Sequence, residues 1–147
     1  MTIYGTVETG KRLGRRLGFP TANLRPRKPV EALPENGVYA AAFWIEGEAG
    51  ARMCMLNQGT HPTAPEGKPT IEAHLLDFDG DLYGMAVRAE YLRFLRPERR
   101  FESLDALSEQ LRRDRDATRR WISEALAGAG EDDASRRVRA IPWVTSP

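Results

Sequence analysis

The chain has 147 residues, of which 41% are hydrophobic and 29% are charged, a balance typical of a globular domain with its own core. Its net charge of +1 gives no overall attraction to nucleic acid or to an anionic membrane, so we expect neither as a partner. No stretch is long enough to cross a bilayer, and the N-terminus lacks the apolar block of a signal peptide. The single cysteine, Cys54, lies in an apolar run and is expected in the core. We therefore predict a cytoplasmic protein, and a monomer.

Short strand-like runs dominate the first hundred residues. They are rich in β-branched, aromatic or alternating apolar side chains and cover residues 2–8, 37–45, 51–57, 69–78 and 84–95. The dipeptide Asp79-Gly80 is typical of a hairpin turn, and Pro97 ends the last run. Residues 25–36 contain three prolines and are predicted to be irregular. Such a series of short strands favours an antiparallel barrel or sandwich.

From Ser103 onward the pattern is that of a helix. Ser103 is a suitable N-cap, and Gly128 and Gly130 end the helix. The residues expected on its apolar face are Leu104, Leu107, Leu111, Thr118, Trp121, Ile122 and Leu126. We assign residues 1–128 to one domain. Residues 129–147 form a tail of unknown role, which is either disordered or docked on the barrel through Trp143.

The charge of Asp114 falls on or near the apolar face of this helix, where it needs a partner. One interpretation is a structural salt bridge to an arginine of the barrel, namely Arg88, Arg93 or Arg96. The other is that Asp114 fixes Arg96 for contact with a ligand.

A basic, glycine-rich stretch precedes Pro20. Gly10, Gly14 and Gly18 alternate with Lys11, Arg12, Arg15 and Arg16. Small residues let backbone N–H groups approach an anion, so this loop suits phosphate, although a solvated basic hairpin fits equally well. Residues 5–12 nearly match a P-loop, but Arg12 stands where the hydroxyl that binds Mg²⁺ belongs, and the match is rejected.

Two further pairs of residues have side chains that suit metal binding or catalysis. Thr21 and Asn23 lie two residues apart, so in extended backbone both oxygens face one side and suit Mg²⁺ when a nucleotide supplies negative charge. The alternative is that both side chains only bond to turn backbone. Glu72 and His74 also share one face of their strand, as a candidate base and its neighbour. The alternative there is an exposed glutamate and a buried, satisfied histidine.

Taken together, these runs resemble the riboflavin kinase family over about residues 3–122. The matching segments are residues 5–7, 17–24, 33–40, 57–63, 71–78, 81–84 and 95–98, with Phe101. The tetrad Pro20-Thr21-Ala22-Asn23 and the run Ile71-Glu72-Ala73-His74 are the most specific. One departure is Gln58, which stands where the family often has isoleucine. The second domain that makes FAD in bifunctional relatives has no counterpart in this sequence, so we expect no conversion of FMN to FAD.

The resemblance implies a mainly β fold, a six-stranded antiparallel Greek-key barrel with a C-terminal α-helix. It implies transfer of the γ-phosphate of ATP to the 5′-hydroxyl of riboflavin, with Mg²⁺ or another divalent metal, to give FMN. Glu72 would be the general base, and Thr21 and Asn23 the metal ligands. The nucleotide would be bound by Gly10, Lys11, Gly14, Arg15, Gly18, Pro20, Thr21 and Asn23. The flavin would be bound by Arg96, Leu95 and Leu104. The alternatives are a flavin- or nucleotide-binding module without catalysis, and a barrel that binds nucleic acid through the cations of residues 11–28.

Overall fold

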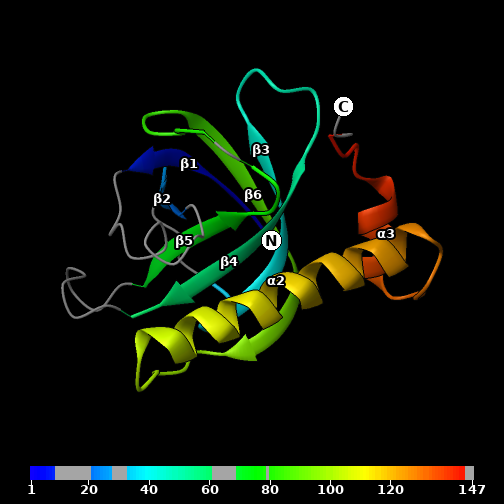
Figure 1. Cartoon of the computed structure of the whole chain (residues 1–147). Coiled ribbons are helices and arrows are strands. Elements are labelled where there is room, and N and C mark those ends of the chain that lie inside the picture. Colours follow the sequence, from blue (N-terminus) through cyan, green and yellow to red (C-terminus); the bar gives the residue numbers. More distant parts are fainter. Residues whose placement is uncertain (9–20, 28–32, 61–68, 79, 145–147) are drawn as a thin grey trace.

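Six strands form a closed barrel with helices on its outside (Figure 1). The computed structural model describes residues 1–8, 21–27, 33–60, 69–78 and 80–144. The strands are β1 (Thr2–Glu8), β2 (Thr21–Pro26), β3 (Gly37–Ile45), β4 (Arg52–Gly59), β5 (Thr70–Leu75) and β6 (Ala86–Pro97). Their order around the barrel is β1-β2-β5-β4-β3-β6, and every neighbouring pair is antiparallel. The predicted mainly β, six-stranded antiparallel barrel is confirmed.

Alternate residues of every strand fill the barrel interior. Phe43 and Leu56 are among the largest fully buried side chains, and Cys54 is buried beside them, as predicted. Burial raises the pKa of the Cys54 thiol far above its usual value, so the thiol stays protonated. β3 is buried on both faces because the long helix α2 (Leu104–Leu126) and, through Ile141 and Trp143, the tail cover its outer side (Figure 1). Two-sided burial explains why the sequence of this strand is almost continuously apolar.

β6 contains two irregularities that aim side chains at α2. Its register against β3 shifts twice, so that Leu92 and Leu95 have no partner residue on β3. A bulge lets two successive residues face the same side of a sheet. Leu92 and Leu95 therefore pack outside the barrel. Their neighbours Arg93 and Arg96 face the same side and contact Trp121 and Asp114 of the helix.

α2 begins where the sequence predicted. The Ser103 hydroxyl accepts a hydrogen bond from the backbone N–H of Ala106 at 3.1 Å. Leu111 and Ile122 are buried against the barrel and the tail. The prediction was wrong for Leu104 and Leu126, which are 51% and 44% exposed. They occupy the first and last positions of the helix, where it runs past its contacts with the barrel.

The tail after α2 is folded, with Trp143 docked. A second helix, α3 (Asp133–Ala140), buries Val138 against α2. Trp143 pairs with Ala51 in an isolated β-bridge, and its indole N–H donates to the carbonyl of Val138 at 2.9 Å. Of the two alternatives for residues 129–147, docking is the one observed for the described part. Whether the tail has a role of its own stays a prediction.

Two local predictions need correction. β2 was not predicted as a strand. It continues through Pro26, so the start of segment 25–36 is not irregular, and its backbone pairs with β1. β5 ends at Leu75 rather than at residue 78, because the chain turns at Asp77, which has a φ of 54°. Of the predicted hairpin dipeptide, Asp79 lies outside the described residues.

Candidate functional site

Three polar residues form a row across neighbouring strands on the outside of the barrel. Asn23 of β2 lies directly opposite Glu72 of β5, and Glu72 lies directly opposite Asn57 of β4. Directly opposed residues of an antiparallel pair point to the same face. That face is the outer one, because the flanking Ile71 and Ala73 belong to the interior core. Asn23 and Glu72 therefore share one side of the barrel.

A second row lies next to the first. Thr21 is paired with His74, which in turn is paired with Met55 of β4. The Thr21 hydroxyl oxygen and His74 Nδ1 are 3.4 Å apart, although the two residues are 53 positions apart in the sequence. Thr21, Asn23 and Glu72 thus occupy one continuous patch, in which strand alternation accounts for the common side of Thr21 and Asn23.

His74 is the buried member of this patch. Its side chain is only 4% exposed, and burial lowers the pKa of the imidazole from 6.5 to about 4. The negative charge of Asp114 opposes this shift without cancelling it. The imidazole is therefore neutral at pH 7 and can accept the Thr21 proton or donate its own. Of the two alternatives given for His74, the structure agrees with a buried histidine that has a hydrogen-bond partner.

Asn23 has a feature that fits a metal ligand. Its Oδ1 atom is buried and makes no hydrogen bond to any described residue. A buried amide oxygen without a partner is costly, and a hard cation would satisfy it. Across the described ranges no group of three or more His, Cys, Asp or Glu side chains could hold a metal ion. The oxygen donors on this face therefore include the neutral oxygens of Asn23 and Thr21 and the single carboxylate of Glu72.

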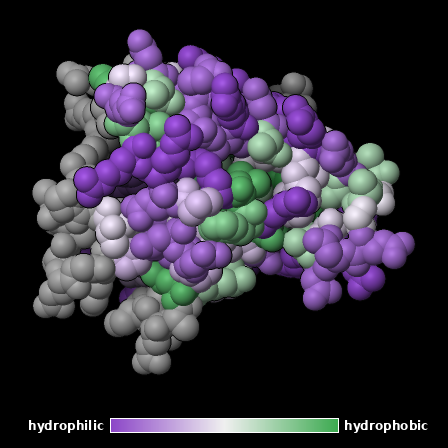
Figure 2. All heavy atoms as spheres, turned by 90° about the horizontal axis from the view of Figure 1, so that it is seen from below, coloured by the Kyte–Doolittle hydropathy of each residue, from purple (hydrophilic) through white to green (hydrophobic). Residues whose placement is uncertain are grey.

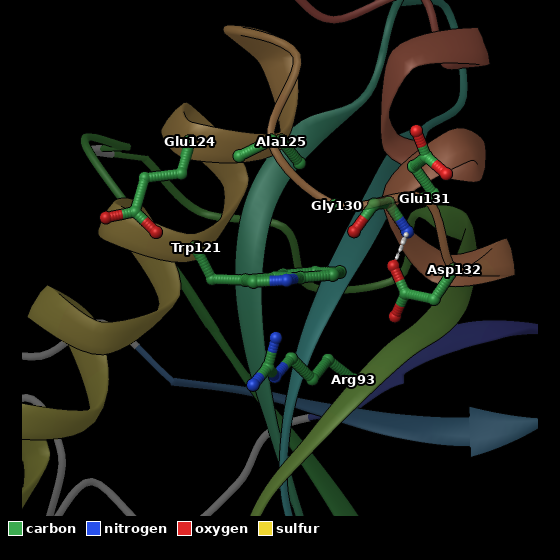
Figure 3. Close-up of a pocket in the computed structure, with 9 residues that line it drawn as sticks. Arg93, Trp121, Glu124, Ala125, Gly130, Glu131 and Asp132 are labelled. Atoms are coloured by element: carbon green, nitrogen blue, oxygen red, sulfur yellow. Dashed lines mark hydrogen bonds between the residues drawn. The ribbon is translucent and has the colours of Figure 1, made fainter.

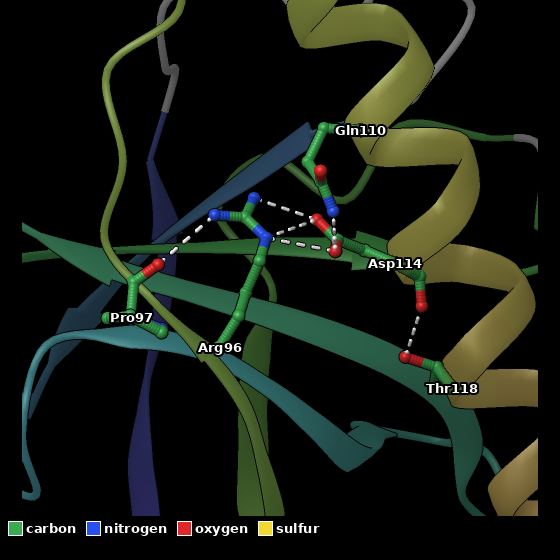
Figure 4. A network of polar contacts seen from close by, with 5 residues as sticks. All are labelled: Arg96, Pro97, Gln110, Asp114 and Thr118. Carbon is green, nitrogen blue, oxygen red and sulfur yellow. Dashed lines mark hydrogen bonds and ion pairs between the residues drawn. The ribbon is translucent and has the colours of Figure 1, made fainter.

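A charged network lies where β6 meets α2 (Figure 4). Arg96 Nε is 2.9 and 3.1 Å from the two carboxylate oxygens of Asp114, and a terminal guanidinium nitrogen is 2.8 Å from one of them. Gln110 donates a further hydrogen bond to Asp114 at 2.9 Å. The Asp114 side chain is 4% exposed and that of Arg96 is 17% exposed. Of the three arginines considered for Asp114, Arg96 is its partner, so the predicted salt bridge is confirmed.

The row of polar residues continues toward this network. Beyond Asn57, the register passes through Val38 of β3 to Arg96 of β6. Leu95 packs beside Val38 under α2, while Leu104 at the start of the helix is half exposed. Arg96 and Leu95, two of the residues predicted for the flavin, therefore lie on the opposite side of Glu72 from Asn23.

The remaining predicted nucleotide contacts cannot be placed. They lie outside the described residues and are Gly10, Lys11, Gly14, Arg15, Gly18 and Pro20. Gly5, which opened the rejected P-loop match, lies within β1. A Cβ there would collide with the carbonyl oxygen of Arg25 on β2, so close strand packing explains this glycine.

Sequence reasoning missed the role of Gln58. Its side chain is fully buried and accepts a hydrogen bond from the Tyr91 hydroxyl at 2.8 Å. Its amide nitrogen donates to the Pro34 carbonyl at 2.7 Å and to Asn36 Oδ1 at 3.1 Å. The departure from isoleucine at this position is thus accommodated by a satisfied polar network. A tyrosine at an inward position of β6 was the available signal, since a buried phenol needs a partner.

A cavity of about 320 Å³ lies between the end of α2 and the start of α3 (Figure 3). The Arg93 guanidinium is 5.4 Å from the centre of the Trp121 ring at its wall, and Glu124 and Glu131 also line it. Asp132 is a third carboxylate of the lining, so the charged side chains there are mainly acidic. None of the residues predicted for catalysis or substrate binding lines it.

The surface on the side shown in Figure 2 is mainly hydrophilic, with hydrophobic residues in small groups. None of the described helices combines the length and the hydrophobicity that crossing a membrane requires.

Comparison with known proteins identifies the family. The model of the Flavokinase family, described as riboflavin kinase, matches residues 1–122. The bifunctional riboflavin kinase/FMN adenylyltransferase of Bacillus subtilis is 36% identical over 124 residues, which are 82% of this chain and 38% of that protein. The RNA-binding riboflavin kinase of the same organism is 39% identical over 113 residues, 76% of this chain and 47% of that protein. The chain thus spans less than half the length of these two relatives.

A solved structure extends the likeness to nearly the whole chain. The crystal structure of riboflavin kinase from Trypanosoma brucei superposes with a TM-score of 0.63 at 28% identity. The match covers 99% of this chain and 92% of that one. Similarity over almost the full length of both chains includes the barrel together with its helices.

Proposed function

Because this chain belongs to the riboflavin kinase family, we propose that it transfers the γ-phosphate of ATP to the 5′-hydroxyl of riboflavin, giving FMN and ADP. The observation that carries the proposal is the row on the outer face of the barrel. It puts the Glu72 carboxylate between the amide of Asn23 and the side that leads to Arg96. An alcohol phosphotransferase needs a base that lies between a ligand for the metal of the nucleotide and the binding site of the alcohol that accepts the phosphoryl group.

In this proposal Glu72 is the general base. Its carboxylate accepts a hydrogen bond from the attacking hydroxyl, holds the hydroxyl oxygen toward the phosphorus, and takes its proton as the new P–O bond forms. Since phosphoryl transfer depends mostly on positioning and charge neutralisation, holding the hydroxyl in line is the larger part of this role.

Thr21 and Asn23 would hold a divalent metal, Mg²⁺ being the expected one. The bound metal supplies positive charge that neutralises the phosphate oxygens. His74 fixes the Thr21 hydroxyl through the 3.4 Å contact, and Asn23 Oδ1, which accepts no hydrogen bond from the described residues, would coordinate the metal. Both donors are neutral, so their affinity for a metal depends on the charge of a bound nucleotide.

The other substrate contacts are also proposals. The loop with Gly10, Lys11, Gly14, Arg15 and Gly18, followed by Pro20, would bind the nucleotide phosphates through backbone N–H groups and cations. On the flavin side, Leu95 and Leu104 would contribute apolar surface, and Arg96, held by Asp114, would present a fixed cation. A cytoplasmic location and a monomeric state also stay proposals of this kind.

Replacement of Glu72 by glutamine tests the central role. Glutamine keeps the size and strand position of Glu72 but cannot accept a proton, so kcat for FMN formation should fall by at least about 100-fold. The assay contains ATP, Mg²⁺ and riboflavin and separates FMN by chromatography. Thermal melting should change little, since Glu72 lies on the outside of the barrel.

Three results would count against the proposal. Near-normal turnover of Glu72→Gln would remove Glu72 as the base. Wild-type protein that binds riboflavin and ATP but forms no FMN would favour the non-catalytic binding module. Wild-type protein that binds neither substrate would exclude both.

A further inference from the structure

The structure assigns a further substrate-binding residue: we propose that the carboxamide of Asn57 hydrogen-bonds a hydroxyl of the acceptor's polyol chain and so positions the reacting alcohol beside Glu72. This inference rests on the proposed function, since it names a contact within the same acceptor site. The acceptor class is a polyhydroxylated chain attached to an aromatic ring system, as in riboflavin.

Asn57 lies where such a contact is needed. It is the direct cross-strand neighbour of Glu72, on the side away from Asn23. Opposed residues of antiparallel strands have Cβ atoms about 4.5–5.5 Å apart, so a hydroxyl chain passing Glu72 comes within reach of the Asn57 amide. Beyond Asn57 the same row leads through Val38 to Arg96, the side proposed for the flavin.

The Asn57 side chain is also available. It is half-buried, and among the described residues no hydrogen bond from its carboxamide is found. Its neighbour Gln58 differs in this respect, because three hydrogen bonds inside the barrel occupy that amide. Gln58 therefore has a structural role, whereas Asn57, one residue earlier on the outer face, keeps both a donor and an acceptor for a ligand.

The chemistry of the side chain suits a polyol. A hydroxyl group donates one hydrogen bond and accepts others, and a carboxamide offers both complements in one plane. On the other side of Glu72, Asn23 differs, since its buried oxygen has no hydrogen-bond partner among the described residues, which suits a metal donor. The two asparagines that flank Glu72 are thus expected to act on different substrates.

The test compares Asn57→Ala with two controls. Asn23→Ala changes the other asparagine of the row, and Thr6→Ala removes an exposed side chain of β1. Each variant is measured for steady-state FMN formation, for riboflavin binding by quenching of flavin fluorescence without nucleotide, and for unfolding in urea.

For Asn57→Ala we expect KM and Kd for riboflavin to rise about 5- to 10-fold, the usual consequence of losing one neutral hydrogen bond. KM for ATP should stay within about twofold of wild type. Asn23→Ala should show the reverse pattern, with riboflavin affinity preserved, and Thr6→Ala should leave all values unchanged. Asn57→Gln, which restores an amide on a longer side chain, should recover part of the riboflavin affinity.

A wild-type enzyme that forms FMN while Asn57→Ala keeps normal riboflavin KM and Kd would overturn the inference and leave the proposed function intact. Equal losses of affinity for riboflavin and for ATP, together with a lower stability in urea, would assign Asn57 a merely structural role. That result would also overturn the inference. If the wild-type protein neither binds riboflavin nor forms FMN, the inference fails together with the proposed function.

Discussion

Removal of the Asp114 carboxylate should destabilise the whole chain, because it breaks the charged network that joins α2 to β6. In Asp114→Ala, Arg96 loses three close contacts to the carboxylate and Gln110 loses one. The guanidinium is left next to a helix face with no opposite charge. We expect a lower free energy of unfolding and a lower melting temperature.

The magnitude follows from the burial of the two partners. Removing one partner of a fully buried ion pair lowers the free energy of unfolding by about 3–5 kcal/mol. Asp114 is 4% exposed, but the Arg96 side chain is 17% exposed and can turn partly into water, which reduces the penalty. We therefore expect a loss of about 2–3 kcal/mol, which corresponds to a fall of about 5–10 °C in melting temperature for a domain of this size.

Urea denaturation of four proteins provides the assay: wild type, Asp114→Ala, Arg96→Met and the double variant. The coupling energy of this double-mutant cycle should be about 1–3 kcal/mol, since the two residues share one network. Glu109→Ala is the matched control on the same helix. Its exposed pairs with Arg112 and Arg113 are expected to contribute less than about 0.5 kcal/mol.

Riboflavin affinity then separates the two interpretations of the pair. Unchanged affinity in Asp114→Ala, despite the lower stability, would make the salt bridge purely structural. An affinity loss in Asp114→Ala that equals the loss in Arg96→Met would mean that Asp114 holds Arg96 for the ligand. A destabilisation no larger than that of Glu109→Ala, with a coupling energy near zero, would refute the reasoning about this network.

Two further predictions concern other buried polar groups. His74 has a pKa of about 4 in the folded chain and 6.5 when exposed. Between these two pH values the unfolded chain binds a proton at this imidazole that the folded chain does not bind. The free energy of unfolding should therefore fall by up to about 3 kcal/mol as the pH drops from 6.5 to 4. Urea midpoints across this window should fall less steeply for His74→Gln than for wild type, and parallel curves would contradict the assignment. Gln58→Ile, which introduces the residue common in the family, should cost about 1–3 kcal/mol here, because it leaves the Tyr91 hydroxyl and Asn36 without their partner. Calorimetry that finds this variant equal to or more stable than wild type would show that the network can rearrange.

Five of the six strands and the long helix were predictable because local patterns specify them, whereas β2 was not among the predicted strands. Alternating apolar residues, turn dipeptides and the Ser103 N-cap act within a few residues of each other. The resemblance to a family supplied the closed barrel, since closure depends on pairing between distant strands. Thr21 and His74, 53 positions apart, meet only because β2 pairs with β5. Alternation predicts which residues of one strand share a face, but it does not predict which residue of β5 lies next to Thr21.

Other features depend on tertiary contacts that leave little trace in the sequence. The shifts in β6 that turn Leu95 and Arg96 toward the same side involve no glycine or proline within the bulges, so no local signal announces them. Helix α3 is short and half of its residues are charged, and its stability depends on Val138 and on Trp143, which docks beside Ala51. An isolated helix of this length is marginal in water, so propensity alone could not predict it.

The composition of the patch around Glu72 has a consequence for the order of binding. Its two candidate metal donors, Thr21 and Asn23, carry no charge, and the described residues contain no cluster of acidic, histidine or cysteine ligands. A divalent cation loses much of its hydration on binding, and neutral oxygens alone compensate poorly for that loss. The nucleotide phosphates must then supply the negative charge, so metal and ATP should bind as a unit rather than in succession. We therefore expect the site to respond to the nucleotide–metal complex and not to free metal.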